Sequence, residues 1–389
     1  MSTRAVVVLS LAAFSSSASQ RSGDPLLPLL AQAFGTTAGA ASAVLTAFAV
    51  AYGSVQLVIG PFGDRVGKYR MVFWLAAVSA ATSLACAFAP VLPLLVAARF
   101  ANGATIGAIV PLAIAWIGDT IPYERRQAVL ARFLIGTLLG GALATAASGA
   151  LGERFGWQAI FYVLAVLYVV TAALLYRELQ VNPAAGHRAP VDEALLQSFG
   201  RMFGLLRGRW VRVVLVTVFL EGALSYGGFA FAAYHAHHAL GLSVSASALL
   251  VTTFALGGLL YAALAGRLVP RLGERGLVVA GGLLLLFGLP GLALAPGAAW
   301  AVPALLAQGL GLIMLHNTLQ VHATQMAPES RGSALALFAF SLFTGQAVGV
   351  AIASRFVDSH GTTPVFLAAG VGVAVLAFVF ERQLAARRR

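Results

Sequence analysis

The sequence has 389 residues, of which 60% are hydrophobic and 10% charged, with a formal net charge of +12 and a mean hydropathy of +0.89. A water-soluble fold could not cover this much apolar surface, since soluble domains have roughly 25% charged residues. The basic residues are scattered over short loops and form no single stripe, which argues against a nucleic-acid partner. The lipid bilayer is therefore the expected solvent, and long unbroken apolar runs favour helices over a barrel.

Twelve apolar runs are long enough to cross a bilayer, which takes about 20 residues. Six of them lie near residues 5–31, 39–60, 70–89, 92–118, 127–152 and 157–177. The other six lie near residues 211–235, 244–266, 277–296, 300–325, 332–354 and 363–380. The first run could also be a signal peptide, but Arg4 alone makes a weak basic start, and we retain the run as a span.

A polar segment at residues 178–210 separates the two sets of six, and its residues 195–206 have the periodicity of an amphipathic helix on a membrane surface. Residues recur across this division at a constant offset of 206: Gly60/Gly266, Gly67/Gly273, Asn102/Gln308, Gly103/Gly309, Pro122/Pro328 and Arg125/Arg331. Two further pairs, Gly156/Gly361 and Phe161/Phe366, are offset by 205. We therefore predict a duplicated unit, with a first half at 1–180, a cytoplasmic linker at 181–210 and a second half at 211–389.

Basic residues mark one set of alternate loops and both ends of the chain: Arg4, Arg65, Lys68, Arg70, Arg125, Arg126, Arg188, Arg201, Arg207, Arg209, Arg271, Arg275, Arg331 and Arg387 to Arg389. The opposite loops hold little beyond Arg154 and Arg355, each near an acid. Since cytoplasmic loops carry the excess of lysine and arginine, we expect a multi-pass inner-membrane protein with both termini in the cytoplasm.

The loop between the second and third spans has the sequence GPFGDRVGKYR. It resembles the signature loop of the major facilitator superfamily, G-x-x-x-D-R-x-G-[RK], at Gly60, Asp64, Arg65, Gly67 and Lys68. A degenerate copy, with Pro270 in place of the acid, lies where the family has its second loop, at Gly266, Arg271, Gly273 and Arg275. Arg99, Asn102 and Gly103 resemble the family's R-x-x-[QN]-G in the fourth span.

The resemblance implies the major facilitator fold, an all-α integral membrane protein of twelve transmembrane helices in two pseudo-symmetric six-helix halves. It also implies that the signature loop latches the cytoplasmic side in the outward-open state. The charges of this loop could instead serve topology alone. Pro25 and Pro28 resemble a paired-proline feature of the drug-exporter branch, whereas the fifth span lacks the glycine-proline pair common in its proton-coupled exporters.

Four ionisable residues lie inside the expected spans: Arg21, Asp24, Arg99 and Glu221. Each costs free energy in the bilayer and so marks a candidate site. Asp24 and Arg99 lie at similar depths and can meet, while Arg21 and Asp24 have the i, i+3 spacing of a helical pair. The resemblance places these three in a central cavity, where a proton on Asp24 would change the pairing. They could also form a permanent ion pair that only fixes helix packing.

Glu221 lies near the expected middle of the bilayer with no basic residue within one helical turn. We expect it to be unpaired and neutral for much of the time, as a second proton-site candidate, or hydrogen-bonded to a neighbouring helix. Polar candidates for lining a substrate cavity, each of which could instead bond two helices together, are Tyr52, Gln56, Asn102, Tyr226, His316, Asn317 and Gln320.

No nucleotide-binding loop of the form G-x-x-x-x-G-K-[ST] occurs in the sequence, which leaves an ion gradient as the energy source unless another chain supplies an ATP-driven motor. We expect a proton-coupled efflux antiporter of a small drug, sugar or metabolite, acting as a monomer by alternating access, with no cofactor. A proton-coupled importer or symporter and a non-transporting receptor or scaffold are alternatives. A metal or metal-chelate exporter is another, since His235, His237 and His238 cluster at the end of the seventh span and His316 and His322 lie in the tenth, but we predict no metal site. An enzyme is not expected, because no nucleophile and base share one depth.

Overall fold

The computed structural model describes residues 3–186 and 195–387, and every regular element in these two ranges is a helix. Ten of the helical segments are long and apolar enough to cross a membrane. One of the ten, α14, is long enough for two crossings, and the helices from Thr3 to Ala33 supply one more. The chain therefore has the twelve crossings expected from its hydropathy.

The first half begins with α1 (Thr3–Arg21), a 3₁₀ turn η1 (Asp24–Leu26) and α2 (Leu27–Ala33). Its other elements are α3 (Ala38–Ala41), α4 (Ala43–Val66), α5 (Lys68–Ala87), α6 (Leu92–Ile106), α7 (Ile109–Thr120), α8 (Tyr123–Phe155), α9 (Ala159–Val181) and the turn η2 (Pro183–Gly186). The expectation of one continuous first span over residues 5–31 is wrong in this detail. Gly23 and Pro25 interrupt the helix, because proline cannot continue the backbone hydrogen bonding of the turn before it.

The second half contains α11 (Arg209–Glu221), the π-helical turn η4 (Gly222–Tyr226), α12 (Gly227–Phe229), α13 (Ala232–His238), α14 (Val244–Ala293), α15 (Ala298–Gln325), the turn η5 (Pro328–Ser330), α16 (Arg331–His360) and α17 (Thr362–Arg387). Helix α14 has 50 residues, or about 75 Å, more than twice the hydrocarbon thickness of a bilayer. Its backbone turns at Gly273, where φ is 61° and ψ is 179°. The two parts match the separate spans expected at 244–266 and 277–296.

Between the halves lie α10 (Leu195–Gly204) and the turn η3 (Leu205–Arg207). Helix α10 covers most of the stretch expected to be an amphipathic helix, and its Met202 is buried against the base of α11. Residues 187–194 of the linker lie outside the described ranges. The domain limits at residues 180 and 210 and the placement of α10 on a membrane surface stay predictions.

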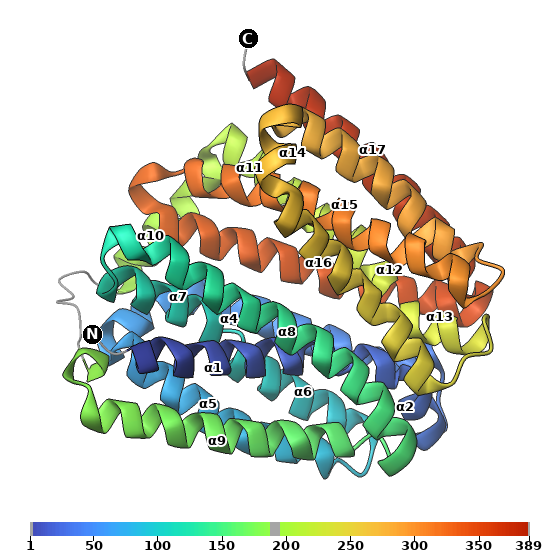
Figure 1. The fold of residues 1–389 in the computed structure, drawn as a ribbon, viewed down its shortest axis with the longest axis horizontal. Helices are drawn as coiled ribbons and strands as arrows, with labels where there is room; N and C mark the ends of the chain where they lie inside the picture. The colour runs from blue at the N-terminus through green and yellow to red at the C-terminus, as the bar shows by residue number, and fades with distance from the viewer. Residues whose placement is uncertain (1–2, 187–194, 388–389) are drawn as a thin grey trace.

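The two halves repeat each other in backbone detail. Six glycines in the described ranges have positive φ, and they form three pairs at the offset of 205 or 206: Gly35/Gly241, Gly67/Gly273 and Gly156/Gly361. Such backbone conformations are open to glycine at little cost, so each pair marks one turn present in both copies. In Figure 1 the blue-to-green helices α1–α9 gather on one side and the yellow-to-red helices α11–α17 on the other.

Glycines also set the closest helix contacts in both halves. A β-carbon on Gly103 of α6 would overlap the carbonyl oxygen of Phe48 in α4, and one on Gly309 of α15 would overlap that of Phe254 in α14. Gly103 and Gly309 are 206 positions apart, and so are Phe48 and Phe254. The halves meet along two faces, where α4 packs on α16 and α8 packs on α14. A buried core cluster continues across this junction.

Candidate functional site

The interruption after α1 places Arg21 and Asp24 at the junction between the halves. The Nη1 atom of Arg21 lies 3.5 Å from Oδ2 of Asp24, so the pairing expected from their i, i+3 spacing is present. The guanidinium of Arg21 also lies 4.8 Å from the ring centroid of Tyr226, a residue of the second half. This stacking is a cation–π contact, and it connects the ion pair of one half to the broken seventh crossing of the other.

Arg99 of α6 is 1% exposed and is held by groups of its own half. Its Nη1 atom donates to the carbonyl oxygen of Ser19 at 3.3 Å and to Oδ1 of Asn102 at 3.2 Å, and its guanidinium covers the ring of Phe48. Arg99 and Asp24 border the same small cavity, which has room for about one water molecule. Gln20, Phe343 and Gln346 line it too, and sequence reasoning did not select them because no local pattern marks them.

Glu221 ends α11 directly before the π-helical turn and has no exposed surface. Its Oε2 atom lies 2.9 Å from Nδ1 of His316 in α15, whereas its Oε1 atom has no hydrogen-bond partner. The expectation that Glu221 is unpaired is therefore wrong, and the alternative, a hydrogen bond to a neighbouring helix, is the arrangement present. The residues within one helical turn of Glu221 include no partner for it, because its partner, His316, lies on a helix 95 positions further along the chain. The π turn adds a residue to one helical turn, and such turns are frequent at functional sites.

The polar candidates for a substrate cavity fall into two groups. Gln56 donates to the carbonyl oxygen of Gly107 at 2.7 Å, and Asn102 donates to Thr82 and Ser83, so these two bond helices together. Tyr52 is buried and its ring lies 4.3 Å from that of Phe343 across the junction of the halves. In the second half, Tyr226 contacts Arg21 and His316 contacts Glu221. The half-buried Asn317 and the exposed Gln320 lie further along α15. Their part in binding a substrate stays a prediction.

The signature loop forms a tight turn at Gly67, with φ of 97°, between α4 and α5. Lys68 forms an ion pair with Asp119 of α7, at 2.5 Å and within the same half. The surroundings of Gly60 and Asp64 lie outside what the structure describes, and Arg65 is exposed. The role of this loop as a latch between the halves stays a prediction.

The second-half copy of the loop turns at Gly273 and places the exposed Arg271 beside it. Arg275 donates from Nε to Oε1 of Glu381 in α17 at 2.6 Å. A β-carbon on Gly266 would have nothing within 4 Å, so this glycine is not needed for close packing. Both loops therefore tie their turns to a helix of their own half.

The three clustered histidines bind three different partners. His235 contacts Thr362 at 2.6 Å, His237 contacts the carbonyl oxygen of Leu242 at 2.6 Å, and His238 stacks on Tyr234. Within the described residues, no three or more histidine, cysteine, aspartate or glutamate side chains are grouped so that they could hold a metal ion.

Two repeated six-helix bundles with buried charged groups where they meet define a polytopic membrane transporter of the duplicated type. The family profile of the Major Facilitator Superfamily matches residues 9–341 and 223–387, and the chain belongs to this family. An uncharacterized MFS-type transporter of Bacillus subtilis, YceJ, is 23% identical over 363 residues, covering 86% of this chain and 85% of that protein.

Two further relatives are informative. A bicyclomycin resistance protein homologue of Haemophilus influenzae is 28% identical over 188 residues, covering 48% of this chain and 46% of that protein. The crystal structure of a mutant form of the nucleoside transporter NupG superposes with a TM-score of 0.80 at 15% identity and covers 97% of this chain and 98% of that chain. The likeness to NupG shows the shared fold.

Proposed function

We propose that the protein is a proton-coupled antiporter that exports a small organic molecule across the inner membrane. The two halves rock around the buried polar groups where they meet, so that these groups face one side of the membrane and then the other. Both termini face the cytoplasm in this proposal, because the loops on their side carry the excess of basic residues. The protein acts as a monomer, since each chain contains both halves.

The observation that carries this proposal is a pair of buried carboxylates within the expected spans, Asp24 in the first half and Glu221 in the second, each beside a group that responds to its charge. A proton on Asp24 would remove the attraction that holds Arg21, whose guanidinium also contacts the second half. A proton on Glu221 would neutralise a fully buried carboxylate and change its hydrogen bond to His316. Movement of a proton at Asp24 therefore changes a contact where the halves meet, and at Glu221 it changes a contact between α11 and α15 of the second half.

The similarity to a bicyclomycin resistance protein homologue supports export of an organic molecule. The resemblance of Pro25 and Pro28 to the drug-exporter branch points the same way, and Pro25 is part of the interruption that positions Asp24. Aromatic side chains beside the charged groups, Phe48, Tyr226 and Phe343, suit a cargo with an apolar ring or chain.

The test is proton flux in liposomes. The purified protein is reconstituted with a pH-sensitive dye inside, a proton gradient is imposed, and candidate cargos are added to wild type, Asp24→Asn and Glu221→Gln. We expect cargo-dependent proton flux in wild type and a loss of at least tenfold in each variant, because neither amide can carry the proton.

The matched control is Glu178→Gln, which also neutralises a buried carboxylate but lies beside Arg4 at the ends of α1 and α9. Its flux should match wild type. Unchanged flux in both test variants would contradict the proton sites. A proton flux that accompanies entry of the cargo would replace the proposed export with import and leave the proton coupling in place.

A further inference from the structure

Two carboxylates hold the halves together at the far end of the bundle, which we define as the end opposite the chain termini. The first is Asp358, near the end of α16. Its Oδ1 atom accepts from the backbone N–H of Gly39 at 2.8 Å, and its Oδ2 atom accepts from Oγ1 of Thr37 at 2.7 Å. Thr37 is the N-cap of α3 in the other half. A β-carbon on Gly39 would overlap Asp358, so the two helices are in close contact.

The second carboxylate is Glu153, near the end of α8. Its Oε2 atom accepts from the backbone N–H of Ser245 at 2.8 Å. Ser245 lies in the first turn of α14, whose N-cap is Ser243. The contact again joins the end of a helix in one half to the start of a helix in the other, with the direction reversed.

These two contacts are one contact repeated. Thr37 and Ser243 are 206 positions apart, as are Gly39 and Ser245, while Glu153 and Asp358 are 205 apart. These are the offsets of the internal duplication. The pseudo-symmetry that relates the halves therefore also relates these two carboxylate contacts. They lie on the two faces where the halves meet, α4 with α16 and α8 with α14.

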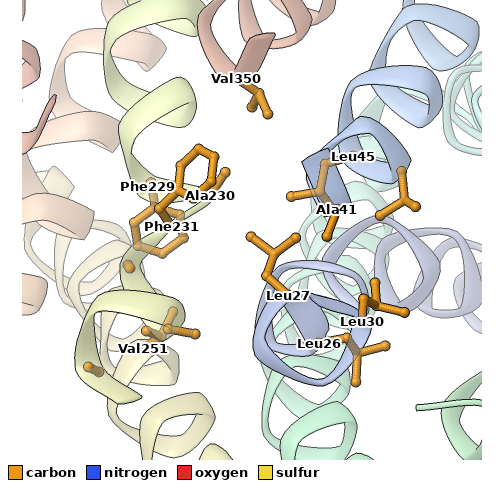
Figure 2. Close-up of a cluster of buried hydrophobic side chains, with 14 of the residues drawn as sticks. Leu26, Leu27, Leu30, Ala41, Leu45, Phe229, Ala230, Phe231, Val251 and Val350 are labelled. Carbon is orange, nitrogen blue, oxygen red and sulfur yellow. The ribbon is translucent and has the colours of Figure 1, made fainter. Parts of the chain in front are cut away.

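An apolar seal closes the same end. Figure 2 shows Leu27 and Leu45 of the first half opposite Phe229 and Phe231 of the second, with Val350 of α16 beside them. All five are buried in one cluster that spans both halves. Leu45 of this seal also lines the small cavity that Asp24 and Arg99 border, so the seal lies directly beside the charged groups.

We propose that Glu153 and Asp358 are gate residues that hold the far end closed, and that both contacts break when this end opens. The proposal depends on the alternating access described above. An ionised carboxylate at a helix start is stabilised by the unsatisfied N–H groups and the helix dipole, and an amide in its place loses most of that attraction. Since both carboxylates are exposed, replacing either one by an amide should shift the closed-to-open ratio by about two- to fivefold.

The test measures opening with a thiol reporter. In a Cys86→Ala background, which removes the only native cysteine, Val350→Cys places a thiol of similar size in the seal. The rate of its reaction with a membrane-impermeant maleimide is measured in lipid nanodiscs. We expect Glu153→Gln and Asp358→Asn each to raise the rate about two- to fivefold, and the double variant to raise it by roughly the product.

Glu178→Gln is the control, because it neutralises a carboxylate at the opposite end whose partners, Arg4 and Asn182, belong to its own half. Its labelling rate should stay at the wild-type value. Thr37→Val removes one donor to Asp358 and the N-cap bond to the backbone N–H of Ala40, with no change of charge. It should give a smaller rise, and it replaces the double variant if that variant folds poorly.

Labelling within twofold of wild type in the single and double variants, all monodisperse in detergent, would overturn the gate. The reporter needs neither cargo nor proton gradient, so its result is separate from the antiport assay. Faster labelling without proton flux would leave the gate in place and remove the proton coupling. Proton flux with unchanged labelling would do the reverse.

Discussion

The buried charges are where the two copies of the duplicated unit differ. Arg99 is 206 positions before Leu305, and Glu221 is 206 positions after Ser15, so neither charge has a counterpart in the other half. The glycines that set backbone contacts do repeat. Charge in a bilayer is costly and persists where it has a use, whereas packing glycines are needed in both bundles for the same steric reason.

The contact between Glu221 and His316 carries a prediction at the residue scale. His316→Leu removes the partner of Oε2 and leaves both oxygens of a fully buried carboxyl group without one. We expect a loss of about 1–2 kcal/mol in the free energy of unfolding, measured by denaturation in detergent micelles.

Adding Glu221→Leu to His316→Leu should recover most of that loss, because no polar atom then remains unsatisfied. The control is Gln320→Leu, one turn further along α15 at an exposed position, which should stay close to wild type. A His316→Leu variant as stable as wild type would mean that the contact contributes nothing to the folded state.

At the scale of the helices, the close approach of two helices depends on glycine, which has no β-carbon. Gly103 and Gly309 meet the backbones of Phe48 and Phe254, and Gly140 and Gly345 meet the backbones of Phe14 and Phe219. Gly140 and Gly345 are 205 positions apart, and so are Phe14 and Phe219. Since backbone cannot move aside as a side chain can, these positions determine how near the helices lie.

Gly103→Ala and Gly309→Ala should each destabilise the protein by about 1–3 kcal/mol, because the added methyl overlaps a carbonyl oxygen. Gly118→Ala in α7 is the matched control, since its β-carbon would have nothing within 4 Å and alanine favours a helix. We expect it to be neutral or slightly stabilising. The same denaturation measurement decides, and equal stability of all three variants would contradict the packing argument.

At the scale of the whole molecule, the distribution of charge predicts which way the protein faces. Both chain ends and the two signature loops lie on one side, where the basic residues are concentrated. A fluorescent protein that folds only in the cytoplasm should therefore fluoresce when fused after Arg389. Alkaline phosphatase, active only outside the cytoplasm, should be active when inserted at Gly297 and inactive after Arg389. The reverse pattern would invert the orientation.

Much of the architecture follows from local features of the sequence. Apolar run length predicts the crossings, constant offsets predict the duplication, and the spacing of Arg21 and Asp24 predicts their pairing, because each depends on residues close in the chain or on simple repetition. The signature loop and the hydropathy together also indicate the family, which the profile match confirms.

The tertiary structure alone decides which distant side chains meet. Glu221 finds His316, Gln56 turns to the backbone of Gly107, and Glu153 and Asp358 reach across to the opposite half. These outcomes depend on the rotation of each helix about its axis and on how the two bundles dock. Helix rotation is set by packing against neighbours that lie up to hundreds of positions away, and no spacing within one helix contains that information.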